Sequence, residues 1–80
     1  MSTALVLVNC DLGTEDALIK GLSKMSGVSF AYKTQGVYDM IVRLDLGSTD
    51  ALRKAIQQVR KFDNVRSSLT MIVKEDEEED

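Results

Sequence analysis

The sequence predicts a two-layer α+β domain, in which two helices lie on one face of a four-stranded antiparallel sheet. Three observations support this prediction: a repeated segment, a helix-start signal inside each copy of it, and an extended apolar run on either side of each expected helix. The two copies are DLGTEDALIK at 11–20 and DLGSTDALRK at 45–54. The chain therefore consists of two similar halves, each with the order strand, helix, strand.

The repeated segment ends a strand and begins a helix in each half. Thr14 and Ser48 are expected N-caps, because a side-chain hydroxyl can accept a hydrogen bond from an amide of the first helical turn. The expected elements are a strand at 3–10, a helix at 14–25, a strand at 28–34, a strand at 38–46, a helix at 48–61 and a strand at 64–74. This order defines the ferredoxin-like βαββαβ fold, with the first strand of each half in the middle of the sheet.

The central strands are apolar on both faces. Alternate residues of a strand point to opposite sides, and the helices of this fold cover only one side of the sheet. The other side would leave an apolar patch in water, which soluble monomers rarely do. We expect a homodimer that packs sheet against sheet, as in dimeric α+β barrels, with an interface at Leu5, Leu7, Ile41 and Ile72. The alternative is that these aliphatic side chains simply remain exposed.

The composition argues against several functional classes. Eighty residues make a single domain, and the net charge of −3 disfavours nucleic acid as a direct partner. Without any apolar run of about 20 residues or a signal peptide, we expect a cytoplasmic protein with no membrane contact. The chain has no histidine and one cysteine, Cys10, which disfavours a metal cluster and the commonest acid–base chemistry. We therefore expect no metal, no cofactor and no catalytic residue.

The acidic side chains are unevenly distributed along the chain. The segment EDEEED at 75–80 holds six of the thirteen carboxylates, and we expect it to be a disordered acidic tail. Residues 1–74 are expected to form the folded domain. The basic side chains of that domain, including Lys33 and Arg43, are interpreted as solvated charges rather than ligands.

One irregular stretch, TQGVYDM at 34–40, lies where the two halves join. Gly36 permits the positive φ angle that a tight hairpin needs. The simplest interpretation is a β-turn in which Tyr38 packs on a neighbour and Asp39 accepts hydrogen bonds from loop amides.

Several of these segments together resemble one known family. They are Gly27-Val28 after the first helix, the hairpin G-V-Y-D at 36–39 with M-I-V-R-L after it, and the closing V-R-S-S-L-T-M-I-V at 65–73. The chain resembles the effector-binding domain of the Lrp/AsnC transcription regulators, also called the RAM domain, from about residue 3 to residue 74. Family members usually carry an N-terminal helix-turn-helix, and none precedes the first strand here. The sequence therefore resembles the stand-alone members, for which direct DNA binding is not expected.

The resemblance implies an assembly and a site. In this family the domain dimerises through its sheet, the dimers assemble further into rings, and an amino acid or related effector binds where dimers meet. A tetramer or octamer of dimers, or co-assembly with a full-length Lrp/AsnC regulator, would follow. Asp39 would accept hydrogen bonds from the ligand ammonium group, while hairpin amides and hydroxyl groups bind its carboxylate. The implied ligand-binding residues are Thr34, Gln35, Gly36, Val37, Tyr38, Asp39, Ser68 and Thr70.

Other small domains of the same topology are the alternatives. An ACT-like metabolite-sensing regulatory domain is the main one, because it shares the fold and the class of function. The hairpin also looks superficially similar to the phosphate-binding loop of acylphosphatases, but the catalytic arginine is missing and Asp39 would repel a phosphoryl group. An RNA-binding module would need exposed aromatic residues on a basic sheet face, and the net charge of −3 argues against this alternative.

Overall fold

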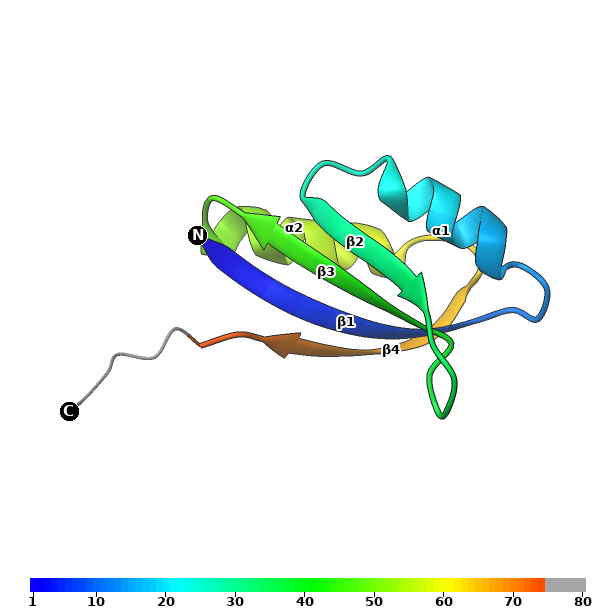
Figure 1. Ribbon diagram of the computed structural model, residues 1–80. Coiled ribbons are helices and arrows are strands. Elements are labelled where there is room, and N and C mark those ends of the chain that lie inside the picture. Colours follow the sequence, from blue (N-terminus) through cyan, green and yellow to red (C-terminus); the bar gives the residue numbers. More distant parts are fainter. Residues whose placement is uncertain (75–80) are drawn as a thin grey trace.

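The structure, a computed structural model, describes residues 1–74 and confirms the ferredoxin-like order (Figure 1). The elements are β1 (Ser2–Cys10), α1 (Glu15–Ser23), β2 (Val28–Lys33), β3 (Met40–Leu46), α2 (Thr49–Arg60) and β4 (Val65–Ile72). Each boundary lies within two residues of its predicted position. The predicted acidic tail, 75–80, lies outside the described residues. Neither helix in the described part of the chain is long and apolar enough to cross a membrane.

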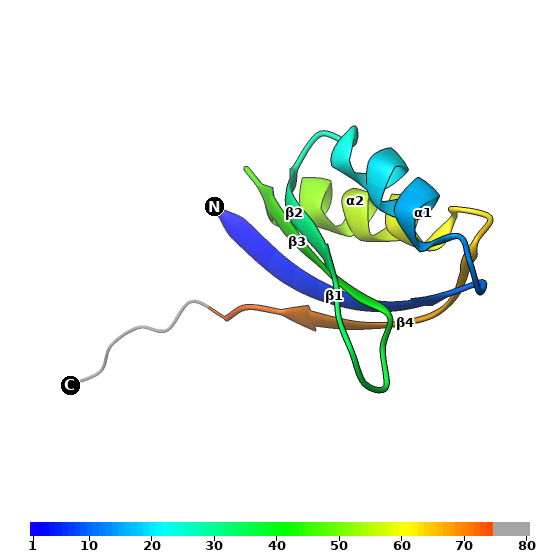
Figure 2. The same cartoon turned by 45° about the vertical axis from the view of Figure 1, so that its right-hand side comes forward.

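The four strands form one sheet in the order β2-β3-β1-β4, with every neighbouring pair antiparallel. The first strand of each half is central, as predicted, and Val6 pairs with Val42 in the middle of the sheet. Both helices lie on the same side of the sheet, and the described chain leaves the other side uncovered (Figures 1 and 2). We call this uncovered side the open face.

The hydrophobic core lies between the helices and the sheet. Alternate residues of the two central strands point into it, and each helix contributes the apolar stripe that its sequence predicts. The fully buried side chains are Ala4, Val6, Val8, Leu18, Leu22, Met40, Val42, Leu44, Leu52 and Val59. This layer packs both helices against one side of the sheet.

The two helix starts differ although their sequences are alike. Ser48 caps α2, because its Oγ accepts a hydrogen bond from the Ala51 amide at 3.1 Å. Thr14 is the N-cap residue of α1, as predicted, but its side chain makes no capping hydrogen bond: its hydroxyl instead donates to the Asp11 carbonyl at 2.7 Å. The reason is that β1 ends at Cys10, so the residues before Thr14 form a turn, which this bond closes.

Candidate ligand-binding hairpin and open sheet face

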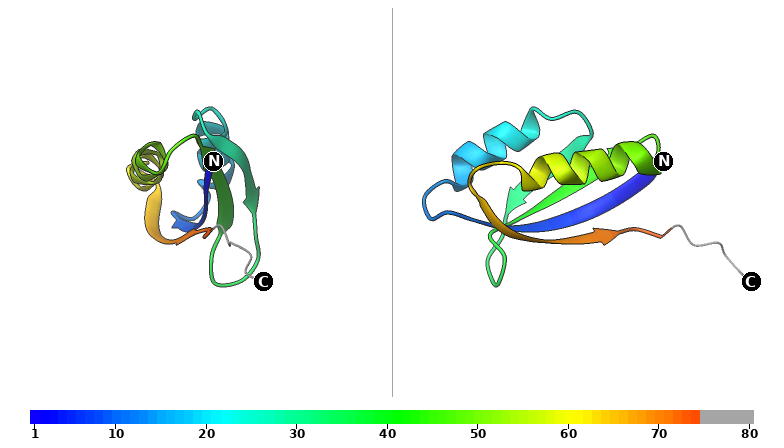
Figure 3. Two further views of the ribbon diagram at one scale, coloured as in Figure 1. Left: turned by 90° about the vertical axis from the view of Figure 1, so that its left-hand side faces the viewer. Right: turned by 180° about the vertical axis from the view of Figure 1, so that it is seen from behind.

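The connection between β2 and β3, residues 34–39, is the hairpin in which the sequence places most of the candidate site. It extends away from the helices and beyond the open face, as all views show (Figures 1 to 3). Its base is closed by the Thr34 amide, which donates to the Asp39 carbonyl at 2.9 Å, and by the Thr34 hydroxyl, which donates to the Tyr38 carbonyl at 2.7 Å. Gly36 has the expected positive φ, 127°. The next residue, Val37, is 83% exposed.

Asp39 fastens this hairpin to the end of β1. Its amide donates to the Val8 carbonyl at 2.9 Å and to Asn9 Oδ1 at 3.1 Å. Its Oδ2 accepts the Cys10 amide at 2.9 Å, whereas Oδ1 accepts no hydrogen bond within residues 1–74. One carboxylate oxygen is thus used by the fold, and the same carboxylate also lies beside the Cys10 thiol.

The Cys10 thiol lies beside this anchor. Burial is the largest cause that raises its pKa, and the nearby Asp39 and Glu15 carboxylates raise it further. The thiol therefore stays protonated at neutral pH. Its side chain is buried and contributes apolar packing to the core.

Ser68 and Thr70 do not share a pocket with the hairpin inside one chain. They pair with Val8 and Val6, so their side chains lie on the helix-covered face, while the hairpin extends past the open face. Ser68 Oγ accepts a hydrogen bond from Arg60 Nε at 3.3 Å. Thr70 Oγ1 is buried and has no hydrogen-bond partner among residues 1–74. The two groups of predicted ligand residues can meet only if two copies of the chain come together.

The open face contains three of the four predicted dimer residues. Leu5, Leu7 and Ile41 lie on it, each partly exposed. Ile72 does not, because it pairs with Ala4, whose side chain points into the core. The residues of β4 that do pair with Leu5 and Leu7 are Met71 and Leu69, which are 44% and 46% exposed. Phe30 and Tyr32 complete the apolar part of the face, with stacked rings whose centroids are 4.8 Å apart.

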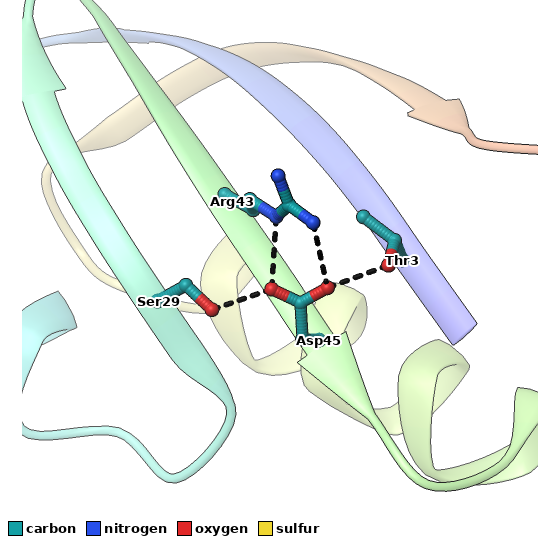
Figure 4. A network of polar contacts seen from close by, with 4 residues as sticks. All are labelled: Thr3, Ser29, Arg43 and Asp45. Atoms are coloured by element: carbon teal, nitrogen blue, oxygen red, sulfur yellow. Dashed lines mark hydrogen bonds and ion pairs between the residues drawn. The ribbon is translucent and has the colours of Figure 1, made fainter. Parts of the chain in front are cut away.

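A polar cluster stands among these apolar side chains (Figure 4). Arg43 binds Asp45 through two hydrogen bonds, Nε to Oδ2 at 2.9 Å and Nη2 to Oδ1 at 3.3 Å. The Thr3 hydroxyl donates to Oδ1 and the Ser29 hydroxyl donates to Oδ2, each at 2.5 Å. Arg43 is thus paired within the chain, although its side chain, interpreted from the sequence as a solvated charge, is 46% exposed. Lys33 is likewise paired, with Asp16 at 2.9 Å, although both side chains are well exposed.

The electrostatics of the cluster favour the charged forms of both partners. The Arg43 guanidinium, followed by the Ser29 and Thr3 hydroxyls, holds the pKa of the Asp45 carboxyl well below its usual value. The same carboxylate raises the pKa of Arg43. The cluster is therefore a neutral ion pair at neutral pH.

This polar cluster was not predicted from the sequence. The signal available was the spacing of Arg43 and Asp45, two residues apart on a strand and so on the same face. The contribution of Ser29 left no signal, because it depends on an irregularity in the pairing of β2 with β3 between Val28 and Phe30.

A hollow of about 420 Å³ on the helix side is separate from the hairpin. Its lining residues are Met25, Gln58, Lys61, Phe62 and Asp63. No residue of the hairpin lines this hollow. Within residues 1–74, no three histidine, cysteine or carboxylate side chains gather in a way that would hold a metal ion.

Taken together, the βαββαβ fold, the projecting hairpin and the uncovered apolar face describe a small binding domain. Its sequence matches the model of the Lrp/AsnC ligand-binding domain family over residues 3–79. The chain therefore belongs to this family, whose members are regulatory effector-binding domains.

Solved structures agree with this assignment. A hypothetical protein of Pyrococcus horikoshii, PHS023, is 30% identical with a TM-score of 0.88, and the match covers 95% of this chain and 93% of that one. The protein FFRP-DM1 is 31% identical with a TM-score of 0.87, over 91% and 99% of the two chains. AsnC of E. coli, 22% identical, shares the fold with a TM-score of 0.82, and the match covers 94% of this chain and 52% of AsnC.

Curated relatives include an enzyme. Homocitrate synthase of Saccharolobus solfataricus is 31% identical to this chain over 71 residues, which are 88% of this chain and 15% of the enzyme. The same match recurs in several strains of Saccharolobus islandicus. The chain thus spans about a seventh of the length of these curated relatives.

Proposed function

We propose that this domain binds an amino acid at the 34–39 hairpin, in a seam between two copies of the chain, and that the ligand thereby controls assembly. The observation that carries this proposal is Asp39, whose Oδ2 is held by the fold while Oδ1 remains without a partner beside a projecting hairpin. A carboxylate oxygen fixed in this way is well suited to accept charge-assisted hydrogen bonds from an ammonium group.

The rest of the hairpin suits the other groups of an amino acid. Gly36 has no side chain, and nothing lies within 4 Å of the position where a Cβ would stand, so a ligand carboxylate can approach the backbone amides closely. Tyr38 and the exposed Val37 supply apolar surface for the ligand side chain. Thr34 and Gln35 add polar groups at the base and side of the same connection.

The assembly that we propose begins with a homodimer across the open face. Leu5, Leu7 and Ile41, with Leu69 and Met71 in place of Ile72, form an apolar surface that a second copy would cover. A two-fold pair is the commonest way to bury such a surface. Further association of dimers in a ring would bring a hairpin towards Ser68 and Thr70 of another copy, whose hydroxyls then have a ligand or hairpin to bind.

This arrangement couples ligand binding to assembly. A ligand that contacts two copies at once binds the assembled state more tightly than the separated one, so ligand shifts the equilibrium towards assembly. The same seam would admit one copy from a full-length Lrp/AsnC regulator, which makes such a regulator the proposed protein partner. Neither nucleic acid nor a membrane is part of the proposal.

A thermal-shift screen of the standard amino acids tests the ligand. Ligand present at about a hundred times its Kd adds about 2.7 kcal/mol to the free energy of unfolding, which raises the Tm of a domain of this size by about 10 °C or more. We expect one or a few amino acids to do so, and Asp39→Asn to abolish the shift. Asparagine keeps an oxygen for the Cys10 amide but loses the charge.

The matched control is Asp50→Asn, which removes an exposed carboxylate from α2. This variant should keep the full thermal shift. No stabilising amino acid, or an unchanged shift in Asp39→Asn, would refute the proposed ligand site.

A second candidate is suggested by the match to homocitrate synthase. A similar stretch forms part of an enzyme there, so this domain would regulate an enzyme rather than a transcription regulator. The ligand site and the dimer would be the same. Copurification from cell extract with ligand present distinguishes the two candidate functions. The captured partner would be a metabolic enzyme if the domain regulates an enzyme, and a DNA-binding protein if it regulates a transcription regulator.

A further inference from the structure

We propose that Arg43 is the recognition point of the open face, through which a second copy of this chain is selected as the covering partner. The inference rests on the proposed sheet-to-sheet dimer and adds the residue that determines its specificity. Three observations carry it: the way in which Asp45 is surrounded, the unused donors of Arg43, and the position of both among apolar neighbours.

The surroundings of Asp45 suit a carboxylate that becomes buried in an interface. Its two oxygens accept four hydrogen bonds, from Thr3, Ser29 and two nitrogens of Arg43. These donors come from three different strands, and the donor on β2 sits where the register of that strand shifts. A carboxylate that stays in water needs none of these partners, whereas a buried one requires them.

Arg43 has donors to spare. A guanidinium has five N–H groups, and Asp45 accepts hydrogen bonds from two nitrogens of Arg43. The remaining N–H groups of Arg43 have no acceptor within residues 1–74. The Arg43 side chain is 46% exposed, against 20% for Asp45. The arginine is therefore held in place by its carboxylate and presents its free donors to whatever covers the open face.

The position of Arg43 makes those donors decisive. Its cross-strand neighbours are Leu5 on β1 and Phe30 on β2, and Leu5 in turn pairs with Met71. A surface that covers these apolar side chains also removes water from the guanidinium, so it must supply hydrogen-bond acceptors at that point. A covering surface without acceptors there would bind less tightly, because the guanidinium would lose hydrogen bonds to water that nothing replaces. In this way a polar group in an apolar interface selects its partner.

The charge of the face favours a second copy as the occupant. Arg43 and Asp45 neutralise each other, so the face has no net charge that would attract a strongly acidic or basic partner. A second copy offers apolar rows of the same kind together with neutral acceptors on its own open face, such as the hydroxyl of Tyr32. An isologous pair also repeats the Arg43 contact twice, once from each copy.

The test compares the dimer dissociation constant of the wild type with those of Arg43→Lys and of the double variant Arg43→Met, Asp45→Asn, by sedimentation velocity. The double variant removes both charges and makes the face more apolar. If Arg43 served only to neutralise Asp45, this variant would dimerise as tightly as the wild type or more tightly. We expect its dissociation constant to rise about tenfold or more instead, because the anchoring contact is lost.

Arg43→Lys keeps the positive charge but not the planar fork, and we expect a similar weakening. Urea unfolding and far-UV circular dichroism of each variant show that the monomer fold is retained. A wild-type chain that is monomeric would overturn the proposed dimer, whereas a dimeric wild type with an equally tight double variant would overturn only the role of Arg43.

Discussion

At the scale of single residues, two aspartates perform different tasks. Asp39 joins the hairpin to β1 through its backbone and one oxygen, and Asp45 gathers donors from three strands. Asp39 could be found from the sequence because it belongs to a local motif beside a glycine turn. The environment of Asp45 could not, because its partners are brought together only by strand register, including a shift at β2 that no local pattern announces.

Substitution of two glycines gives the prediction at the scale of single residues. Gly27 has φ +93°, and a Cβ there would stand 2.7 Å from a methyl group of Leu46. Gly13 has a similar φ, +84°, but nothing lies within 4 Å of its Cβ position. We expect Gly13→Ala to cost about 1 kcal/mol of unfolding free energy, from backbone strain alone, and Gly27→Ala to cost about 2 to 3 kcal/mol because the clash adds to it. Urea unfolding measures both, and equal losses would contradict the packing of Leu46 against this turn.

At the scale of elements, the duplication explains why so much was predictable. Each half encodes its strand by apolar alternation and its helix by an apolar stripe, and both signals are local. Both halves also make the same kind of closing bond: the Asp11 amide donates to the Asn64 carbonyl, and the Asp45 amide donates to the Gly27 carbonyl. The side chain of Thr14 departed from the prediction because the exact end of β1 decides whether its hydroxyl caps the helix or closes a turn.

The cap of α2 gives the prediction at this scale. Ser48→Ala removes the acceptor for the Ala51 amide and should lower the free energy of unfolding by about 1 kcal/mol. Ser48→Asp should retain most of the stability, since aspartate caps as well as serine. The control is Ser26→Ala, an exposed serine outside the helices, for which we expect a change within about 0.5 kcal/mol. Equal effects of the two alanine variants in urea unfolding would show that the cap is not stabilising.

At the scale of the whole molecule, an uncovered apolar face was predicted from the sequence, but not all of the residues that lie on it. Parity along β4 separates Ile72 from Leu69 and Met71, yet parity alone does not say which group faces the helices. That depends on the register between β1 and β4, which shifts at Asn9 and Cys10. The same register places Ser68 and Thr70 on the helix-covered face, away from the hairpin. A complete site therefore requires more than one copy of the chain in this account.

The most direct measurement of that claim is the mass in solution of the wild type, Ile41→Lys and Ile72→Lys, by light scattering over micromolar concentrations. We expect a dimer or a multiple of it for the wild type, whose monomer mass is 8.9 kDa. We expect a monomer for Ile41→Lys, because a charge then lies in the middle of the open face. Ile72→Lys, on the other side of the sheet, should assemble like the wild type. A wild type that stays at the monomer mass throughout, or an assembly lost in Ile72→Lys but kept in Ile41→Lys, would contradict that claim.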